Sequence, residues 1–207
     1  MAKKLRVYSS VSLDGEKLPE KLDFKEIFGR PGPVHVEIGC GKGAFLLNQA
    51  RIEPDVNFLG IEWANKYYRW AVDRLGRWAI GNVRVIRTDA ADLVARRIPD
   101  ESVDAYHIYF PDPWPKKRHH KRRFLCQANL DHLYRTLRAT GRIYIATDHA
   151  EYFQAIEELA RANAHRFTPI DFKRPAAAES GELTGTNFER KYLKENRPIH
   201  TLALRKK

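Results

Sequence analysis

Acidic side chains flank a glycine-rich stretch in the first third of the chain. Residues 39–44 read Gly-Cys-Gly-Lys-Gly-Ala and fit the pattern G-x-G-x-x-G/A through Gly39, Gly41 and Ala44, with Glu37 before them and Glu62 after them. Such glycines let the backbone approach a ligand, and an acid ending the second strand can accept hydrogen bonds from ribose hydroxyls. The pattern predicts a site for an adenosine-containing cofactor without choosing between cofactors.

Two details favour a positively charged cofactor over a dinucleotide. The carboxylate of Glu37 is expected to point into the cofactor crevice, where it would repel a pyrophosphate and attract a sulfonium compound with an α-amino group. Gly43 extends the run to G-x-G-x-G, a pattern typical of S-adenosylmethionine enzymes. The alternatives are an ion pair between Glu37 and a lysine such as Lys42, and an exposed, helix-leading Glu62.

Asp89 follows the third expected strand, in the sequence Thr-Asp-Ala-Ala. At that position its carboxylate can bind the amino group of an adenine, or it can cap the N-terminus of the next helix. The two roles are compatible.

A proline-rich segment precedes the strongest concentration of positive charge. Residues 110–115 read Phe-Pro-Asp-Pro-Trp-Pro. These prolines fix φ and remove backbone donors, so the segment is a stiff loop and neither a helix nor a central strand. Six cations and no acid follow, in the run Lys116, Lys117, Arg118, His119, His120, Lys121, Arg122 and Arg123. A rigid loop with one carboxylate, one indole and these cations is suited to hold a polyanion near a reacting centre; the alternative is a solvated charged face.

The composition bounds the class of protein. The chain has 207 residues with a formal net charge of +11, and 43% of its residues are hydrophobic, which is typical of one globular domain and excludes a disordered chain. No window approaches 18 apolar residues, and no apolar segment follows the basic start, so we expect a cytoplasmic protein without membrane contact. Cys40 and Cys126 are expected to be reduced thiols. No metal site is expected, because His119 and His120 lack a third ligand at suitable spacing.

Strand and helix patterns alternate along the chain and would bring these residues together. Strands are expected at 34–38, 57–61, 83–86, 103–109, 142–147 and 199–204, with the last one at a sheet edge. Helices are expected after the glycine run, along the stripe from Tyr67 to Trp78, from Cys126 through Leu137 to a stop at Gly141, and over 150–165. This alternation predicts an α/β fold, a mostly parallel sheet with helices on both faces, whose core spans 34–207 after an N-terminal extension at 1–33.

Taken with Thr186-Asn187-Phe188-Glu189, these motifs resemble the bacterial tRNA (guanine-N7)-methyltransferase family. The resemblance covers most of the chain, from about Val34 to Leu204, and the run Pro-Asp-Pro-Trp-Pro-Lys-Lys-Arg-His at 111–119 is its most specific element. It implies a Rossmann-like class I methyltransferase fold with an antiparallel C-terminal edge strand. It also implies S-adenosylmethionine as cofactor and N7 of guanine 46 in the tRNA variable loop as the target. The N-terminal segment matches the longer basic leader of many relatives only loosely.

The resemblance also implies roles for single residues. Asp112 matches the proposed catalytic residue, and the cofactor-contacting acids correspond to Glu37, Glu62, Asp89 and Asp112. Substrate-binding positions correspond to Lys116, Asp148, Thr186 and Glu189. Each has a plainer alternative: Asp148 would cap the helix that starts near Ala150, and Glu189 would pair with neighbours of Arg190. Trp114 would either stack on a base or pack the loop onto the core.

These residues suit the implied chemistry, because N7 of guanine carries a lone pair and no proton and needs no strong base. Two other classes of function remain open at this point. The glycine pattern alone would also serve a nicotinamide-dependent oxidoreductase, which leaves the basic segment unexplained. A non-catalytic RNA-binding module would have no physical reason to keep Glu37, Glu62 and Asp112 together. The sequence does not distinguish a monomer from a homodimer.

Overall fold

Eight strands form one sheet in the computed structural model, which describes residues 5–176 and 178–207. The order across the sheet is β1-β4-β3-β2-β5-β6-β8-β7. The strands are β1 Ser12–Leu13, β2 Val34–Ile38, β3 Asn57–Glu62, β4 Val83–Arg87, β5 Val103–Tyr109, β6 Leu137–Thr147, β7 Phe167–Ile170 and β8 His200–Lys206. All neighbours from β1 to β6 pair in parallel, and β8 runs antiparallel to both β6 and β7.

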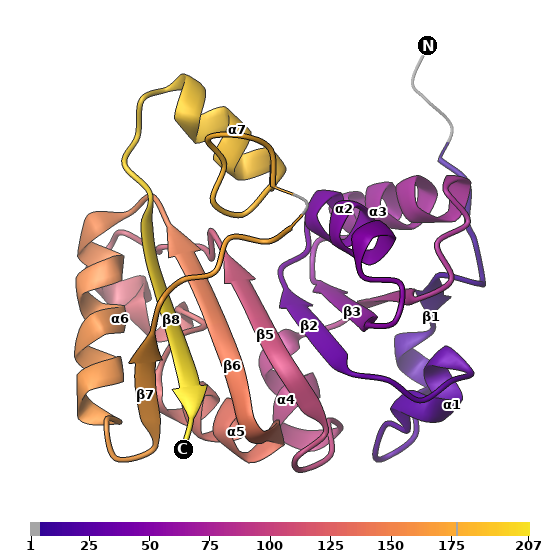
Figure 1. Cartoon of the computed structure of the whole chain (residues 1–207), viewed down its shortest axis with the longest axis horizontal. Helices are drawn as coiled ribbons and strands as arrows, with labels where there is room; N and C mark the ends of the chain where they lie inside the picture. Colours follow the sequence, from indigo (N-terminus) through magenta and orange to yellow (C-terminus); the bar gives the residue numbers. More distant parts are fainter. Residues whose placement is uncertain (1–4, 177) are drawn as a thin grey trace.

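Helices cover both faces of this sheet (Figure 1). They are α1 Phe24–Phe28, α2 Ala44–Ile52, α3 Asn65–Arg77, α4 Ala90–Arg96, α5 Gln127–Thr136, α6 Ala150–Ala162 and α7 Asn187–Lys194, with 3-10 turns η1 Gly15–Lys17 and η2 Lys117–Arg122. Two clusters of buried apolar side chains result, one of which takes in α2 and α3. The predicted α/β fold is therefore confirmed, with parallel strands buried on both faces as such sheets require.

The order of the strands places the site. The chain runs from β2 outward through β3 and β4, then returns to β5 on the other side of β2. In open α/β sheets, ligands bind outside the carboxyl ends of the strands where the order reverses. The loops after β2 and β5 meet there, and they carry the glycine run and the proline-rich segment.

The structure corrects the predicted end of one helix and the predicted position of one strand in the sheet. The helix through Cys126 ends at Thr136 rather than at Gly141, because Leu137 already pairs with Val103 of β5 before the register shifts. The C-terminal strand is antiparallel as predicted, but it lies inside the sheet. The edge is β7, which sequence patterns missed because it is short and contains Pro169, a residue that edge strands tolerate.

The segment 171–199 connects β7 to β8 and carries α7. Because β7 and β8 are antiparallel neighbours, the segment leaves and re-enters the sheet at the same end. Figure 1 shows it crossing in front of the sheet and rising above the carboxyl ends of β5 and β6. The segment that covers the predicted site is therefore the connection between two antiparallel, adjacent strands.

The described part of the N-terminal segment joins the same sheet and core. Ser12 and Leu13 pair with Val85 and Ile86 of β4, and Tyr8 fills the space beside Gly76 of α3. A Cβ at Gly76 would lie 2.1 Å from the Tyr8 ring, so only glycine admits this contact. Residues 1–4 of the predicted extension lie outside the described residues. No described helix is long and apolar enough to cross a membrane.

Candidate active site

The glycine run forms a tight loop between β2 and α2. Gly39, Gly41 and Gly43 have φ values of 74°, 54° and 67°, in the left-handed region that favours glycine. The backbone amide of Gly39 donates to the Ile61 carbonyl of β3 at 2.8 Å. Gly43 begins α2 and packs against Ala71 of α3. The loop therefore shapes the cavity wall at Gly39 and Gly41, while Gly43 serves helix packing.

Glu62 fastens this loop to the end of β3. One carboxylate oxygen accepts from the Gly41 amide at 2.8 Å, and the other accepts from the Ala64 amide at 2.7 Å. The residue is buried, so the alternative of an exposed helix-leading acid is wrong. Each oxygen retains a second lone pair for a ligand hydroxyl.

Glu37 is buried next to this loop, and one of its two carboxylate oxygens has no hydrogen-bond partner in the part of the chain that the structure describes. Its Oε2 atom has no hydrogen-bond partner among the described residues, and only 4% of the residue is exposed. Burial, together with the neighbouring Glu62 carboxylate, raises the pKa of Glu37 to about 8. The alternative pairing with Lys42 is wrong, because the Lys42 ammonium lies over the Trp70 ring instead, 5.7 Å from its centre.

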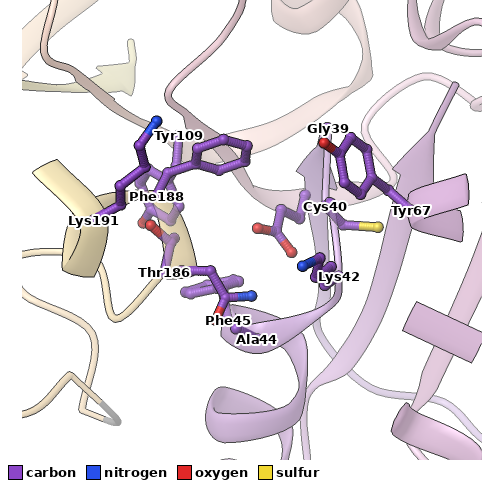
Figure 2. A pocket seen from close by; sticks show the side chains of 13 residues that line it. Gly39, Cys40, Lys42, Ala44, Phe45, Tyr67, Tyr109, Thr186, Phe188 and Lys191 are labelled. Atoms are coloured by element: carbon purple, nitrogen blue, oxygen red, sulfur yellow. The ribbon is translucent and has the colours of Figure 1, made fainter. Parts of the chain in front are cut away.

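Two adjoining cavities converge on these residues. The first is lined by Glu37, the glycine loop, Phe45 and Tyr109 on one side and by Thr186, Phe188 and Lys191 on the other. Figure 2 shows Phe188 and Lys191 facing Cys40, Lys42 and Tyr67 across this cavity. The second is lined by Glu62, Trp63, Asp89, Asp112, Trp114 and Arg122. Both share Gly39, Gly41, Tyr67, Tyr109 and Phe188.

Sequence reasoning missed the aromatic residues of these walls. Tyr109 ends β5 and reads as a core residue, yet it lines both cavities while its hydroxyl meets His107 Nδ1 at 2.9 Å. Phe188 and Tyr67 are each more than a third exposed at the cavity mouth. An aromatic residue at the carboxyl end of a parallel strand is the signal that would have indicated Tyr109.

The proline-rich loop is held in a strained shape by a buried arginine. Phe110 and Trp114 have positive φ values of 53° and 44°, while Asp112 between them is exposed and lines the second cavity. Arg123 donates to the Pro113 carbonyl at 2.8 Å and forms an ion pair with Glu151 of α6 at 2.7 Å. The predicted place of Arg123 in a phosphate-facing patch is therefore corrected, since its guanidinium is buried and committed to this loop.

The other cations of the run remain at the surface. Lys116, Lys117, Arg118, Lys121 and Arg122 are exposed, and His119 and His120 are half-buried on η2. The Arg122 guanidinium lies 5.0 Å from the centre of the Trp114 ring, and the His119 ring meets the same indole edge-on. Trp114 thus contacts Arg122 and His119 at the cavity wall instead of plugging the loop into the core.

Asp89 follows β4 and Asp148 follows β6, in different local settings. Asp89 caps α4 by accepting from the Asp92 amide, and it also lines the second cavity, so the two predicted roles coexist in geometry. Asp148 does not cap α6, because His149 takes that position. Asp148 instead accepts from Arg197 at 2.9 Å, which connects the end of β6 to the segment after α7.

Thr186 and Glu189 build the start of α7. The Thr186 hydroxyl caps the helix by accepting from the Glu189 amide at 3.1 Å. The Glu189 carboxylate is fully buried and accepts from the backbone amides of Leu183, Thr184 and Gly185 and from the Thr184 hydroxyl. The alternative that Glu189 pairs with neighbours of Arg190 is wrong, because these donors take up its carboxylate and the neighbouring Lys191 pairs with Glu195. Of the four predicted substrate positions, only Thr186 lines a cavity.

Known proteins resemble this chain at both the sequence and the fold level. A family model described as "Putative methyltransferase" matches residues 31–202. A tRNA (guanine-N(7)-)-methyltransferase from Rhodopirellula baltica is 35% identical over 198 residues, covering 93% of this chain and 73% of its own. Proteins of the same name from Nocardia farcinica and Alkalilimnicola ehrlichii are 42% and 33% identical, covering 83% and 97% of this chain and 60% and 84% of their own.

Solved structures agree on the fold. The aminoglycoside resistance methyltransferase NpmB1 superposes with a TM-score of 0.59 at 15% identity, covering 88% of this chain and 91% of its own. A SAM-dependent O-methyltransferase from Thermotoga maritima gives a TM-score of 0.56 at 15% identity, with 90% and 66% covered. At such low identity the likeness concerns the fold alone.

Proposed function

The chain belongs to the tRNA (guanine-N(7)-)-methyltransferase family, and from that premise we propose that it methylates N7 of a guanine in tRNA using S-adenosylmethionine. The target we propose is guanine 46 of the variable loop, in the cytoplasm. The main support for this proposal is Glu37, whose buried oxygen has no partner among the described residues. Glu37 lines the first cavity, which adjoins the second cavity, where Asp112 lies. Membership of a methyltransferase family also disfavours the nicotinamide-dependent alternative.

The residues around the glycine loop fit S-adenosylmethionine. Glu37 would accept from its α-ammonium group, since a buried carboxylate without a partner is stabilised by a cationic ligand. Glu62 would accept from the ribose hydroxyls, and Asp89 from the adenine amino group. Gly39 and Gly41 leave room for the ligand at the loop. When bound, the cofactor supplies an electrophilic methyl group on a positively charged sulfur.

Asp112 is proposed as the catalytic residue. Its loop is stiffened by two flanking prolines and fastened by Arg123, so the exposed carboxylate keeps its place beside the cofactor cavity. Methylation of N7 leaves positive charge on the purine, which a nearby carboxylate stabilises while it accepts from the N1 or amino edge. No proton leaves N7, so positioning of the two reactants carries much of the rate.

The remaining residues are proposed to hold the tRNA. Lys116 and the exposed cations of η2 would contact phosphates, with His119 and His120 at the edge of that patch. Trp114 would offer its indole to a base at the cavity wall. Thr186 and Glu189 would act through the shape of the 183–186 turn, and Asp148 through its ion pair with Arg197.

Mass mapping after incubation with unmodified bulk tRNA and S-adenosylmethionine tests the reaction. We expect one 7-methylguanine, at position 46. Thermal stabilisation by S-adenosylhomocysteine but not by NAD is expected, and a shift with NAD alone would contradict the proposal. Asp112→Ala should lower turnover far more than tRNA affinity, with the exposed Glu20→Ala as the matched control. Equal losses in turnover and affinity would make Asp112 a binding residue.

A further inference from the structure

A second basic surface lies on the opposite side of the cleft from η2. Helix α3 turns Ala71, Val72 and Leu75 into the core. Its outward side carries cations, and two more from α2 and the glycine loop join them: Lys42, Arg51, Lys66, Arg69, Arg74 and Arg77. We call these six residues the α3 surface. Figure 1 shows α2 and α3 side by side on the front face of the sheet.

Positive charge on the α3 surface is largely uncompensated. Asp73 is the one acid of α3, and it is buried. Its carboxylate forms an ion pair with Arg77 and accepts a hydrogen bond from the backbone amide of Arg6. Lys66, Arg69 and Arg74 form no ion pair with any residue that the structure describes. Burial lowers the pKa of Arg74, and the positive charges of Arg77 and Arg190 lower it further, so cations crowd here from both α3 and α7.

Two tryptophans are interleaved with these cations. The Arg51 guanidinium lies 4.5 Å from the centre of the Trp78 ring, and the Lys42 ammonium lies over Trp70. Trp78 is 52% exposed. Cations next to indoles form a surface suited to a phosphate backbone with unpaired bases, because the charge meets phosphate while the ring accepts a base.

The α3 surface is continuous with the cleft. Tyr67, in the first turn of α3, lines both cavities, and Lys42 lines the first. The whole of α3, from Asn65 to Arg77, has 13 residues, which corresponds to about 20 Å. Arg122 of η2 lines the second cavity as well, from the loop after β5, which lies on the other side of β2 from β3 and α3. A polyanion that entered the cleft along η2 would therefore meet the α3 surface on leaving it.

We propose that the α3 surface is a second binding surface for the phosphate backbone of the substrate RNA, on the side of the cleft away from η2. The identity of that RNA as tRNA rests on the proposed function, but the surface itself does not. Both RNA and an anionic membrane would complement the charge of this surface, and its continuity with the cleft favours RNA.

Salt dependence of tRNA binding tests this surface. Each phosphate contact contributes roughly 0.7–0.9 to the slope of log affinity against log salt concentration. The triple variant Lys66→Ala, Arg69→Ala, Arg74→Ala should reduce that slope by about 2 and weaken binding at low salt by roughly 10- to 100-fold. The single variant Arg69→Gln should reduce it by about 1.

The matched control removes three exposed cations elsewhere: Lys21→Ala, Lys25→Ala and Arg161→Ala. It should change the slope by much less, although the net charge changes equally. Thermal stabilisation by S-adenosylhomocysteine should be the same in both triple variants. An unchanged slope in the α3 triple variant, or equal changes in both, would overturn the proposal. Loss of binding to phosphatidylserine vesicles with tRNA binding intact would also overturn it. A reduced slope in a protein without methylation activity would support the surface and reject the reaction.

Discussion

Two buried glutamates, Glu37 and Glu189, lie on opposite sides of the candidate site with opposite surroundings. The carboxylate of Glu189 is saturated by donors from residues 183–185, whereas one oxygen of Glu37 has no donor among the described residues. Both carboxylates lie near Tyr109, whose pKa is raised chiefly by burial and further by these acids. The contrast separates a carboxylate that stabilises a turn of the protein from one that we propose to bind the cofactor.

The largest expected effect comes from Glu37→Gln. Removing the charge that would meet the α-ammonium should weaken S-adenosylhomocysteine binding by about 150- to 5000-fold, the usual cost of about 3–5 kcal/mol for breaking a buried ion pair. The cofactor-free variant should melt at a higher temperature at pH 8, because a buried unpaired charge has been removed. Calorimetric titration and thermal melts measure both.

Glu53→Gln is the matched control for Glu37. Glu53 also has a buried oxygen without a partner among the described residues, but it lines neither cavity. Its substitution should leave the affinity for S-adenosylhomocysteine unchanged. Equal losses in the two variants would remove the distinction between Glu37 and Glu189.

Glu189→Ala breaks the other half of the comparison. Three amides and one hydroxyl lose their acceptor, and we expect a loss of about 2–3 kcal/mol in the local stability of the 183–194 segment. Hydrogen exchange should quicken there while the sheet stays protected, and the KM for tRNA should rise. If S-adenosylhomocysteine affinity fell as much as in Glu37→Gln, Glu189 would be a ligand-binding acid after all.

The pH dependence of cofactor binding follows from the raised pKa of Glu37. Below about pH 8 the carboxyl is protonated in the free protein, so binding of the ammonium group must release a proton. Affinity for S-adenosylhomocysteine should therefore fall as pH decreases, by about fivefold between pH 8 and pH 7 and by nearly tenfold per pH unit below that. Titrations in buffers of different ionisation enthalpy would detect the released proton, and Glu37→Gln should abolish the trend.

The same pKa sets a trend in the stability of the cofactor-free protein. A carboxyl whose pKa in the folded state is raised above its ordinary value of 4.5 binds more protons in the folded state than in the unfolded state. The contribution of Glu37 to the free energy of unfolding is greatest below about pH 4.5. It declines as the pH rises towards about 8 and stays constant above that. Glu37→Gln should remove this decline from urea unfolding midpoints measured across the window.

Thr186→Ala gives the smallest expected effect and sharpens the role of Glu189. Loss of the helix cap should cost about 1 kcal/mol in the stability of α7, while Thr186→Ser should retain most of it. Hydrogen exchange over 187–194 measures the difference. A loss as large as that of Glu189→Ala would show that the hydroxyl, and not the carboxylate, holds the turn.

What could be predicted from sequence depended on how far apart the interacting residues lie. The glycine loop and the cap at Asp89 were accessible because strand, loop and helix follow one another within a few residues. Arg123 was misplaced because a cation run suggests solvent, and its burial depends on Glu151 of α6. Glu189 was misjudged for a related reason, since its donors come from a turn without regular secondary structure.

The path of residues 171–199 separates two properties of the site. Both ends of this segment are secured by the β7–β8 hairpin, so its length and composition can change without altering any register of the sheet. The wall made by the glycine loop and the cover that carries α7 can therefore diverge independently among relatives. An exchange of this segment between two members of the family would test whether it carries a preference for one RNA target.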